Sequence, residues 1–463
     1  MRSLTATLGA GLLALAAFAA GSPAAASAAA STQVTGTLPD GASWIADMPA
    51  QWNGVLLLYS HGFGPLTPAD APDPATAAAL LARGYALAGS SYDPHGSMWA
   101  LDSAVRDQFQ TLRQVESSVL PGPPRQVLAF GTSMGGLVSA LEAQNGAGLI
   151  DGALTTCGIV AGGINLNNYQ LDGEYTLAQL LLPGQQVQLV RFANTGDALA
   201  TAATLAQAAA TAQQTPAGRA RLALALAFIN VPPWAPGQAA PPPPTDPAAQ
   251  EAAQYQVEFA GAFNTLDFIE AGRPSIDQAD GGSASWTRGV NFAELLGRSP
   301  YLPEVVALYR AAGLSLHADL ATLTSHADIS PDPAAVGSLF RTSVPWGHLA
   351  VPELDLHTIS DQLVPVQQEN FYAHQVYAAG SGELLRQAYV ASVGHCNFSP
   401  AELVAGVLAI SQRAATGRWG AVADPDSLNQ VAASLGLGPA RFASGYRPGP
   451  LTGVNGLDGL LRH

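Results

Sequence analysis

Short apolar runs alternate with helix-like patterns in the first third of the chain. Residues 55–60, 85–90, 127–130 and 151–160 are apolar runs, and the first three are each followed by a segment with apolar residues at helical spacing. Runs of this length predict strands, and the spacing between them predicts helices. Strands alternating with helices predict an α/β fold, with a mostly parallel central sheet that is flanked by helices on both faces.

The same alternation returns near the end of the chain. Residues 353–359 and 387–393 have patterns that predict two more strands, and a helical pattern follows the second. The intervening segment, residues 165–346, is rich in Ala, Gln and Leu and predicts helices only. We therefore expect an α/β core made of residues 31–164 and 347–420, interrupted by an inserted helical cap.

Two stretches fit neither pattern. The proline density of residues 231–247, inside the cap, forbids regular structure, and we expect a floppy surface excursion there. Residues 421–463 are rich in Gly and Pro, and the sequence assigns no role to this C-terminal tail.

The amino terminus is typical of an export signal. Arg2 precedes an uncharged apolar run over residues 4–20, and small residues follow at positions 26–28. The alternatives are a membrane anchor, which needs about 20 strongly apolar residues, and a lipoprotein, which needs a cysteine that this segment lacks. We expect residues 1–30 to be a signal peptide, and the mature protein to be secreted without stable membrane anchoring.

Composition narrows the classes of function. The chain has 463 residues, of which 48% are hydrophobic, and a net charge of −15 at neutral pH. Nucleic acid is bound mainly through basic patches, and the sequence contains none, so we expect no nucleic-acid partner. The nine histidines form no HExxH motif and have no companion cysteines, and no phosphate-binding glycine loop follows a strand. We expect no metal and no cofactor.

A serine stands among glycines where a predicted strand meets a predicted helix. The segment GTSMG at residues 131–135 directly follows the apolar run 127–130. At such a junction this motif predicts a nucleophile elbow, a sharp turn that exposes the oxygen of Ser133 above the sheet edge. A Cβ on Gly131 or Gly135 would collide with the neighbouring strand and helix, so we expect both positions to require glycine.

The base and the acid that a serine nucleophile needs follow two later strands. Asp361 comes just after the predicted strand 353–359, and His395 just after 387–393. Both lie at the carboxyl edge of the sheet, where ligands bind in parallel sheets. The order Ser133, Asp361, His395 is the order expected of this elbow architecture, so we expect these three to form a catalytic triad.

Other candidates fit less well. Asp355 lies inside a predicted strand and remains the alternative acid. His317 and His326 fall in the predicted cap and precede Asp361, which is the wrong order for the base.

The loop after the first predicted strand of the core is a second candidate element. The segment YSHGFG at residues 59–64 follows that strand, and an acyl-transfer site needs two N–H donors aimed at the developing oxyanion. We expect these donors to be the amides of Met134 and Phe63, with His61 and Gly62 supporting the turn. A plain glycine-rich turn is the alternative.

Together, the segments SHGFG, GTSMGG, SDQLVP and GHCNF resemble the α/β-hydrolase superfamily, in particular its secreted bacterial esterases and lipases. The resemblance covers roughly residues 50–165 and 350–418. It implies an α/β-hydrolase fold with the triad Ser133–His395–Asp361. It also implies a helical cap inserted near Asn165, after the strand that follows the nucleophile helix.

The cysteines Cys157 and Cys396 are the two in the chain. An even pair in an exported protein favours a disulfide over free thiols. Cys157 follows the strand after the nucleophile helix and Cys396 adjoins His395, so both lie at the same sheet edge. We expect them to be bonded.

The expected activity is hydrolysis of a carboxylic ester or lactone. A hydrophobic small-molecule substrate fits the apolar, weakly charged cap. The same triad would cleave an amide, so an exported peptidase or amidase remains open. A non-catalytic binding protein on the same scaffold is the third possibility, although such a protein is expected to have lost part of the triad.

Overall fold

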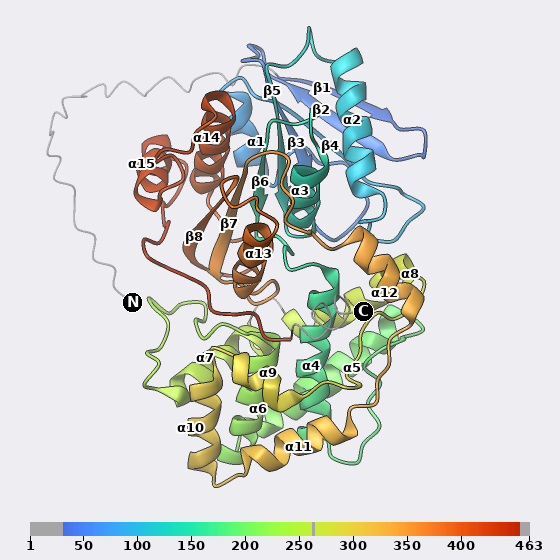
Figure 1. The fold of residues 1–463 in the computed structure, drawn as a ribbon, viewed down its shortest axis with the longest axis vertical. Helices are drawn as coiled ribbons and strands as arrows, with labels where there is room; N and C mark the ends of the chain where they lie inside the picture. The colour runs from blue at the N-terminus through green and yellow to red at the C-terminus, as the bar shows by residue number, and fades with distance from the viewer. Residues whose placement is uncertain (1–30, 262–263, 454–463) are drawn as a thin grey trace, which may run out of the picture.

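The computed structural model describes residues 31–261 and 264–453 (Figure 1). A sheet covered by helices forms the upper half of the view, and helices alone form the lower half. The strands are β1 (Thr32–Thr37), β2 (Ser43–Met48), β3 (Val55–Ser60), β4 (Ala86–Ser90), β5 (Gln126–Thr132), β6 (Gly152–Thr156), β7 (Glu353–Ser360) and β8 (Leu385–Val393). The helices of the upper half are α1 (Pro74–Leu81), α2 (Ala104–Ser118), α3 (Met134–Asn145), α13 (Gln367–Ala378), α14 (Pro400–Thr416) and α15 (Pro425–Leu435).

The sheet has the order β1-β2-β4-β3-β5-β6-β7-β8. Strand β2 runs antiparallel to both β1 and β4, and all neighbours from β4 to β8 are parallel. Strands β3, β4 and β6 are buried along their whole length, as parallel strands covered on both faces must be. The α/β-hydrolase fold predicted from the sequence is confirmed.

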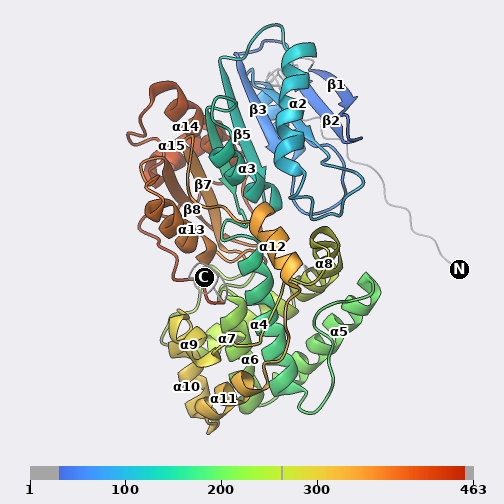
Figure 2. The ribbon, with the colours of Figure 1, turned by 45° about the vertical axis from the view of Figure 1, so that its right-hand side comes forward.

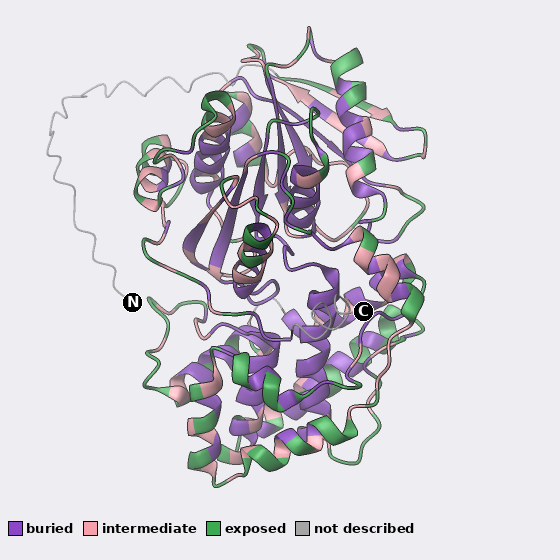
Figure 3. Cartoon of the chain, viewed as in Figure 1, coloured by how far each residue is buried: buried purple, intermediate pink, exposed green. Residues whose placement is uncertain are grey.

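Each face of the sheet carries its own apolar core. Leu57 and Phe130 pack on one face with α1, α14 and α15, whereas Leu58 packs on the other with α2, α3 and α13. Adjacent residues of β3 separate in this way because successive side chains of a strand point to opposite faces. The strands are purple throughout the centre of the upper half in Figure 3, which marks buried residues.

The lower half is inserted between β6 and β7. It consists of α4 (Gly163–Leu181), α5 (Thr195–Ala212), α6 (Pro216–Ile229), α7 (Pro247–Phe259), α8 (Thr265–Asp280), α9 (Phe292–Arg298), α10 (Leu302–Ala312), α11 (Leu316–His326) and α12 (Pro333–Thr342). Leu177, Leu205 and Leu224 contribute to an apolar core within this cap. Helices α8 and α12 lie at the boundary between the two halves (Figure 2).

The proline-rich stretch is irregular, but its beginning is not a floppy excursion. Val231 and Ala235 are fully buried, and the carbonyl of Trp234 accepts a 2.7 Å hydrogen bond from the hydroxyl of Ser360 at the end of β7. The stretch therefore starts as a packed contact between cap and core, and becomes exposed only further along.

The C-terminal tail has a structural role that the sequence did not reveal. The tail begins with α15, which packs on the sheet, and Phe442 after it pairs with Val390 at the edge strand β8. Further on, the carbonyl of Pro448 accepts a hydrogen bond from Asn370 of α13. Thr452 then exchanges two hydrogen bonds with Asn230 at the end of α6, at 2.9 and 3.1 Å. The tail thus binds the cap to the core.

A cluster of charges is buried inside the cap. Arg273 of α8 forms an ion pair with Glu174 of α4, and its Nε atom lies 3.3 Å from Oε2 of Glu270. Glu258 of α7 is also fully buried, and neither of its carboxylate oxygens has a hydrogen-bond partner among the described residues. Burial raises the pKa of Glu258 to about 8, with a further contribution from Glu174. Glu258 is therefore protonated in the folded protein at neutral pH.

The signal peptide predicted over residues 1–30 lies outside the described residues. Within the described part of the chain, no helix combines the length and the apolar character needed to cross a membrane.

Replacing Asn230 tests the contact between tail and cap. Asn230 has φ +66°, which glycine adopts without strain, so Asn230→Gly removes the side-chain hydrogen bonds but keeps the backbone turn. We expect a loss of about 1–3 kcal/mol of unfolding free energy, since Thr452 loses two buried hydrogen bonds. Denaturant unfolding measures the loss. In a chain that ends at Pro448, the same substitution should cost much less; an equal cost would contradict the role of the tail.

Glu258 makes the stability of the cap depend on pH. Its pKa is about 8 in the folded protein against an ordinary 4.5, so unfolding releases a proton and stability falls as pH rises from about 5 to about 8. We expect Glu258→Gln to lose less stability over this window than the unmodified chain, as measured by denaturant unfolding at each pH. Substitution of the exposed Glu116 by Gln is the control. Parallel curves for Glu258→Gln and the unmodified chain would contradict the prediction.

Candidate active site

The turn between β5 and α3 holds Ser133 in an unusual backbone conformation. Its φ is +61° and its ψ is −123°, which non-glycine residues adopt only where the surrounding structure enforces it. A Cβ on Gly131 would lie 1.8 Å from the carbonyl oxygen of Gly135, and one on Gly135 would lie 1.9 Å from that of Ser60. Both glycines are therefore required by the close packing of α3 on the two strands.

The structure brings together the three residues expected to form the triad. The Nε2 atom of His395 lies 2.8 Å from the Oγ atom of Ser133, and its Nδ1 atom lies 2.7 Å from Oδ2 of Asp361. Asp361 follows β7 and His395 follows β8, so both reach the serine from the carboxyl edge of the sheet. In this geometry the imidazole can accept the serine proton while the carboxylate holds the ring in the required tautomer.

The carboxylate of Asp361 is fully buried and yet favours its charged form. Burial acts to raise its pKa, but His395, His357 and the amide of Val364 outweigh that effect, and the pKa lies below its ordinary value. Its Oδ1 atom accepts hydrogen bonds from the amides of Leu363 and Val364, at 3.0 and 2.9 Å. The acid is thus ionised and fixed by its own turn.

The loop after β3 lies against the serine. A Cβ on Gly62 would be 3.2 Å from the Cβ of Ser133, so the loop approaches as closely as a glycine permits. The ring of His61 stacks on Tyr92 with centroids 4.2 Å apart, and burial lowers its pKa. The neutral ring of His61 is thus part of the packing that holds this loop in place.

The two expected oxyanion donors remain a prediction. Met134 is the first residue of α3, where a backbone N–H has no partner within the helix. Phe63 follows Gly62 and lines the cavity beside the serine. Both residues are therefore near the nucleophile.

A cavity of about 40 Å³ opens beside Ser133, between core and cap. Its polar side chains are Ser133 and Gln170, the latter from α4. The remaining lining is apolar apart from one glycine: Phe63, Trp99, Ile159, Leu166, Phe268, Ile269, Gly272, Ile276, Leu363 and Val364. Phe63 of the core and Phe268 of the cap meet edge to face, with ring centroids 5.8 Å apart.

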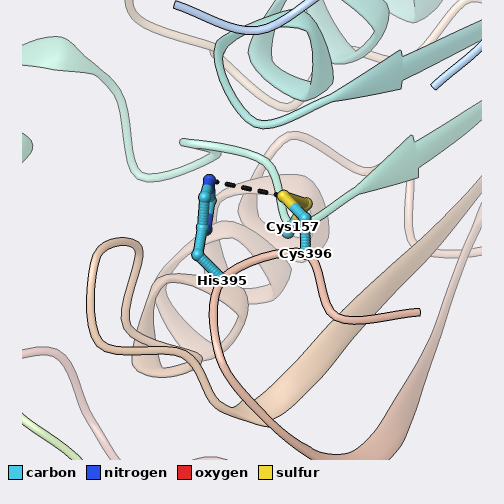
Figure 4. A group of neighbouring side chains, drawn as sticks. All are labelled: Cys157, His395 and Cys396. Carbon is cyan, nitrogen blue, oxygen red and sulfur yellow. Dashed lines mark hydrogen bonds between the residues drawn. A yellow bond between two sulfur atoms is a disulfide. The ribbon is translucent and has the colours of Figure 1, made fainter. Parts of the chain in front are cut away.

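The predicted disulfide is confirmed. Cys157, just after β6, is bonded to Cys396, and their Cα atoms are 5.4 Å apart. The Sγ atom of Cys396 lies 3.3 Å from Nε2 of His395 (Figure 4). The disulfide therefore ties the loop that carries the histidine, after β8, to the segment that follows β6.

The donor atoms of Cys157, His395 and Cys396 lie within 4.8 Å of one another, as the ligands of a metal ion would. A cysteine binds metal as a thiolate. Because the two sulfurs are bonded to each other, this group is part of the serine site and does not have the ligands of a metal centre.

The alternative residues are not at the serine. Asp355 is buried within β7 and accepts a hydrogen bond from Gln387. Burial, together with the nearby Glu369, raises its pKa well above the ordinary value. His317 and His326 are exposed on α11, in the cap.

No sequence pattern marks Gln170, the cavity-lining residues of α8 or His357 as part of the site. Gln170 and the cavity-lining residues of α8 belong to ordinary helical patterns, and His357 is one of several polar residues in β7. Their positions around the site follow only from tertiary packing.

The strand order, the elbow after β5, the acid after β7 and the histidine after β8 define the class of protein. The chain is a serine hydrolase with the α/β-hydrolase fold.

Comparison with known proteins adds one informative similarity. No protein-family model matches the chain. It is 29% identical over 441 residues to the o-phthalyl amidase of Xanthobacter agilis, which covers 89% of this chain and 93% of that protein.

Similarities to solved structures are weak. Feruloyl esterase B from Aspergillus oryzae is 12% identical, with a TM-score of 0.42 over 84% of this chain and 81% of that one. Brefeldin A esterase, a bacterial homologue of human hormone sensitive lipase, is 13% identical, with a TM-score of 0.37 over 88% of this chain and 76% of that one. Similarities at this level say nothing of the substrate.

Removing the disulfide should affect stability and activity together. We expect Cys396→Ser to lose about 2–5 kcal/mol of unfolding free energy, and to lower kcat because the loop of His395 is released. Thermal unfolding and turnover measure the two effects. The double variant Cys157→Ser/Cys396→Ser is the control for a newly freed thiol and should behave like the single one. Titration of two free thiols in the native protein would contradict the prediction.

Proposed function

We propose that this protein is a secreted hydrolase that cleaves an amide or ester of an apolar, aromatic carboxylic acid through an acyl-enzyme on Ser133. The observation that carries the proposal is the hydrogen-bonded series Ser133–His395–Asp361, with contacts of 2.8 and 2.7 Å. A hydroxyl, an imidazole and a buried carboxylate in this order form the arrangement that activates a serine.

The reaction follows from the roles of these groups. The Oγ atom of Ser133 attacks the substrate carbonyl while Nε2 of His395 takes the hydroxyl proton. The amides of Phe63 and Met134 bind the developing oxyanion. His395 then gives its proton to the leaving nitrogen or oxygen, and water hydrolyses the acyl-enzyme with the same imidazole as base. Asp361 remains ionised throughout and stabilises the imidazolium.

The cavity lining and the amidase similarity support an aromatic acyl group. Aromatic and aliphatic side chains surround the serine, and the carboxamide of Gln170 can hydrogen-bond a second polar substituent of the substrate. The similarity to an o-phthalyl amidase favours an amide of an aromatic acid. The ester or lactone expected from the sequence remains the alternative, because the same acyl-enzyme serves both.

An aromatic ring would need more room than the cavity shows. Its volume is about 40 Å³, whereas an engineered cavity that binds benzene has about 150 Å³. Helix α8 supplies Phe268, Ile269, Gly272 and Ile276 to the lining. We infer that substrate entry displaces side chains of α8 from the serine.

Labelling and a substrate panel test this proposal. We expect a fluorophosphonate probe to label Ser133, Ser133→Ala to abolish labelling and to lower kcat/KM at least about 10³-fold, and the exposed-serine variant Ser117→Ala to behave as the unmodified chain. Aryl-acyl amides and aryl-acyl esters should be cleaved in preference to aminoacyl nitroanilides, and their kcat/KM ratio separates amidase from esterase. Absence of labelling in the unmodified chain would favour a non-catalytic binding protein.

A further inference from the structure

A second histidine lies directly behind the acid of the triad. His357 is fully buried within β7, and its Nε2 atom lies 3.6 Å from Oδ2 of Asp361, the oxygen that faces His395. The proposed reaction does not use it. A buried imidazole is costly unless its nitrogens are paired, so its partners indicate what it does.

Both ring nitrogens of His357 have close partners. Nε2 is 2.8 Å from the carbonyl oxygen of Val364, and Nδ1 is 2.7 Å from Oε1 of Glu369. A carbonyl oxygen only accepts hydrogen bonds, so Nε2 must carry a hydrogen. This N–H edge of the ring faces the turn that holds the Asp361 carboxylate.

The partner on the other side is itself anchored. Glu369 belongs to α13, and its Oε2 atom accepts a 2.7 Å hydrogen bond from Gln387 of β8. His357 thus connects the turn after β7 to a helix and to the next strand. The same turn includes Val364, which lines the cavity and donates its amide to Asp361.

We propose that His357 is a positioning residue of the hydrolase, which orients Asp361 toward His395 by holding the carbonyl of Val364. This inference rests on the proposed function. When His395 takes the serine proton, its imidazolium is stabilised only if the Asp361 oxygen stays at hydrogen-bond distance. Without the hydrogen bond from His357, the turn at Val364 and the carboxylate of Asp361 can move. His395 then becomes a weaker base, although no group that touches the substrate has been removed.

Two substitutions of similar polarity separate the two contacts of His357. The amide nitrogen of Gln reaches the place of Nε2, so His357→Gln can still donate to Val364. Asn reaches only the place of Nδ1, so His357→Asn keeps the contact with Glu369 and loses the one with Val364. We expect kcat to fall about 10–100-fold in the Asn variant and to stay within about threefold of the unmodified chain in the Gln variant.

The pH profile distinguishes positioning from a general loss of stability. We expect the acid limb of kcat/KM to move to lower pH in His357→Asn, because the imidazolium of His395 loses part of its stabilisation, and to stay in place in His357→Gln. Val376→Ala, on the buried face of α13, is the stability control. It should lower the melting temperature and leave both the limb and kcat unchanged.

Different outcomes overturn different claims. Equal kcat and equal acid limbs for the Asn variant and the unmodified chain would overturn the positioning role, as would a Val376→Ala variant that reproduces the kinetic changes. If the unmodified chain neither reacts with the fluorophosphonate nor turns over any substrate of the panel, the proposed function fails and this inference fails with it.

Discussion

The close approach of helix α3 to strands β3 and β5 is the constraint on which the site depends. The carbonyl of Ser60 occupies the space that a Cβ on Gly135 would need, so α3 can begin at this distance only because the residue is glycine. The approach fixes the turn in which Ser133 has a φ of +61°. Backbone sterics of this kind cannot relax without moving a strand, and the serine oxygen is therefore the fixed point of the site.

Bonds, rather than sterics, hold the other two groups of the triad. The loop of His395 is bound by the disulfide of Cys396, and Gly394 in the same loop accepts a hydrogen bond from Thr358 of β7. The turn of Asp361 is held by its own backbone amides and, from behind, by His357. Loops are normally the mobile parts of a fold, and these contacts fix the loops of His395 and Asp361 to the sheet.

The sequence predicted what depends on local patterns and not what depends on packing between distant segments. Most core strands are apolar runs, and Ser133, Asp361 and His395 follow strand ends, so the fold class and the members of the triad could both be inferred. Phe268 belongs to a helix like any other, and only tertiary structure brings it to Phe63. The composition of the proline-rich stretch predicted irregular backbone, but it contains no signal for the burial of its first residues.

Helix α8 links the cavity to the electrostatics of the cap. Phe268 and Gly272 line the cavity, while Glu270 and Arg273 of the same helix belong to the buried charge cluster. Burial and the nearby Glu174 raise the pKa of Glu270. The packing of α8 therefore depends on the Glu270 carboxyl remaining protonated in the folded protein. Deprotonation would place on this helix a second carboxylate charge beside Arg273, which is already paired with Glu174. The shape of the cavity and the charge state of the cap are therefore physically coupled through this one element.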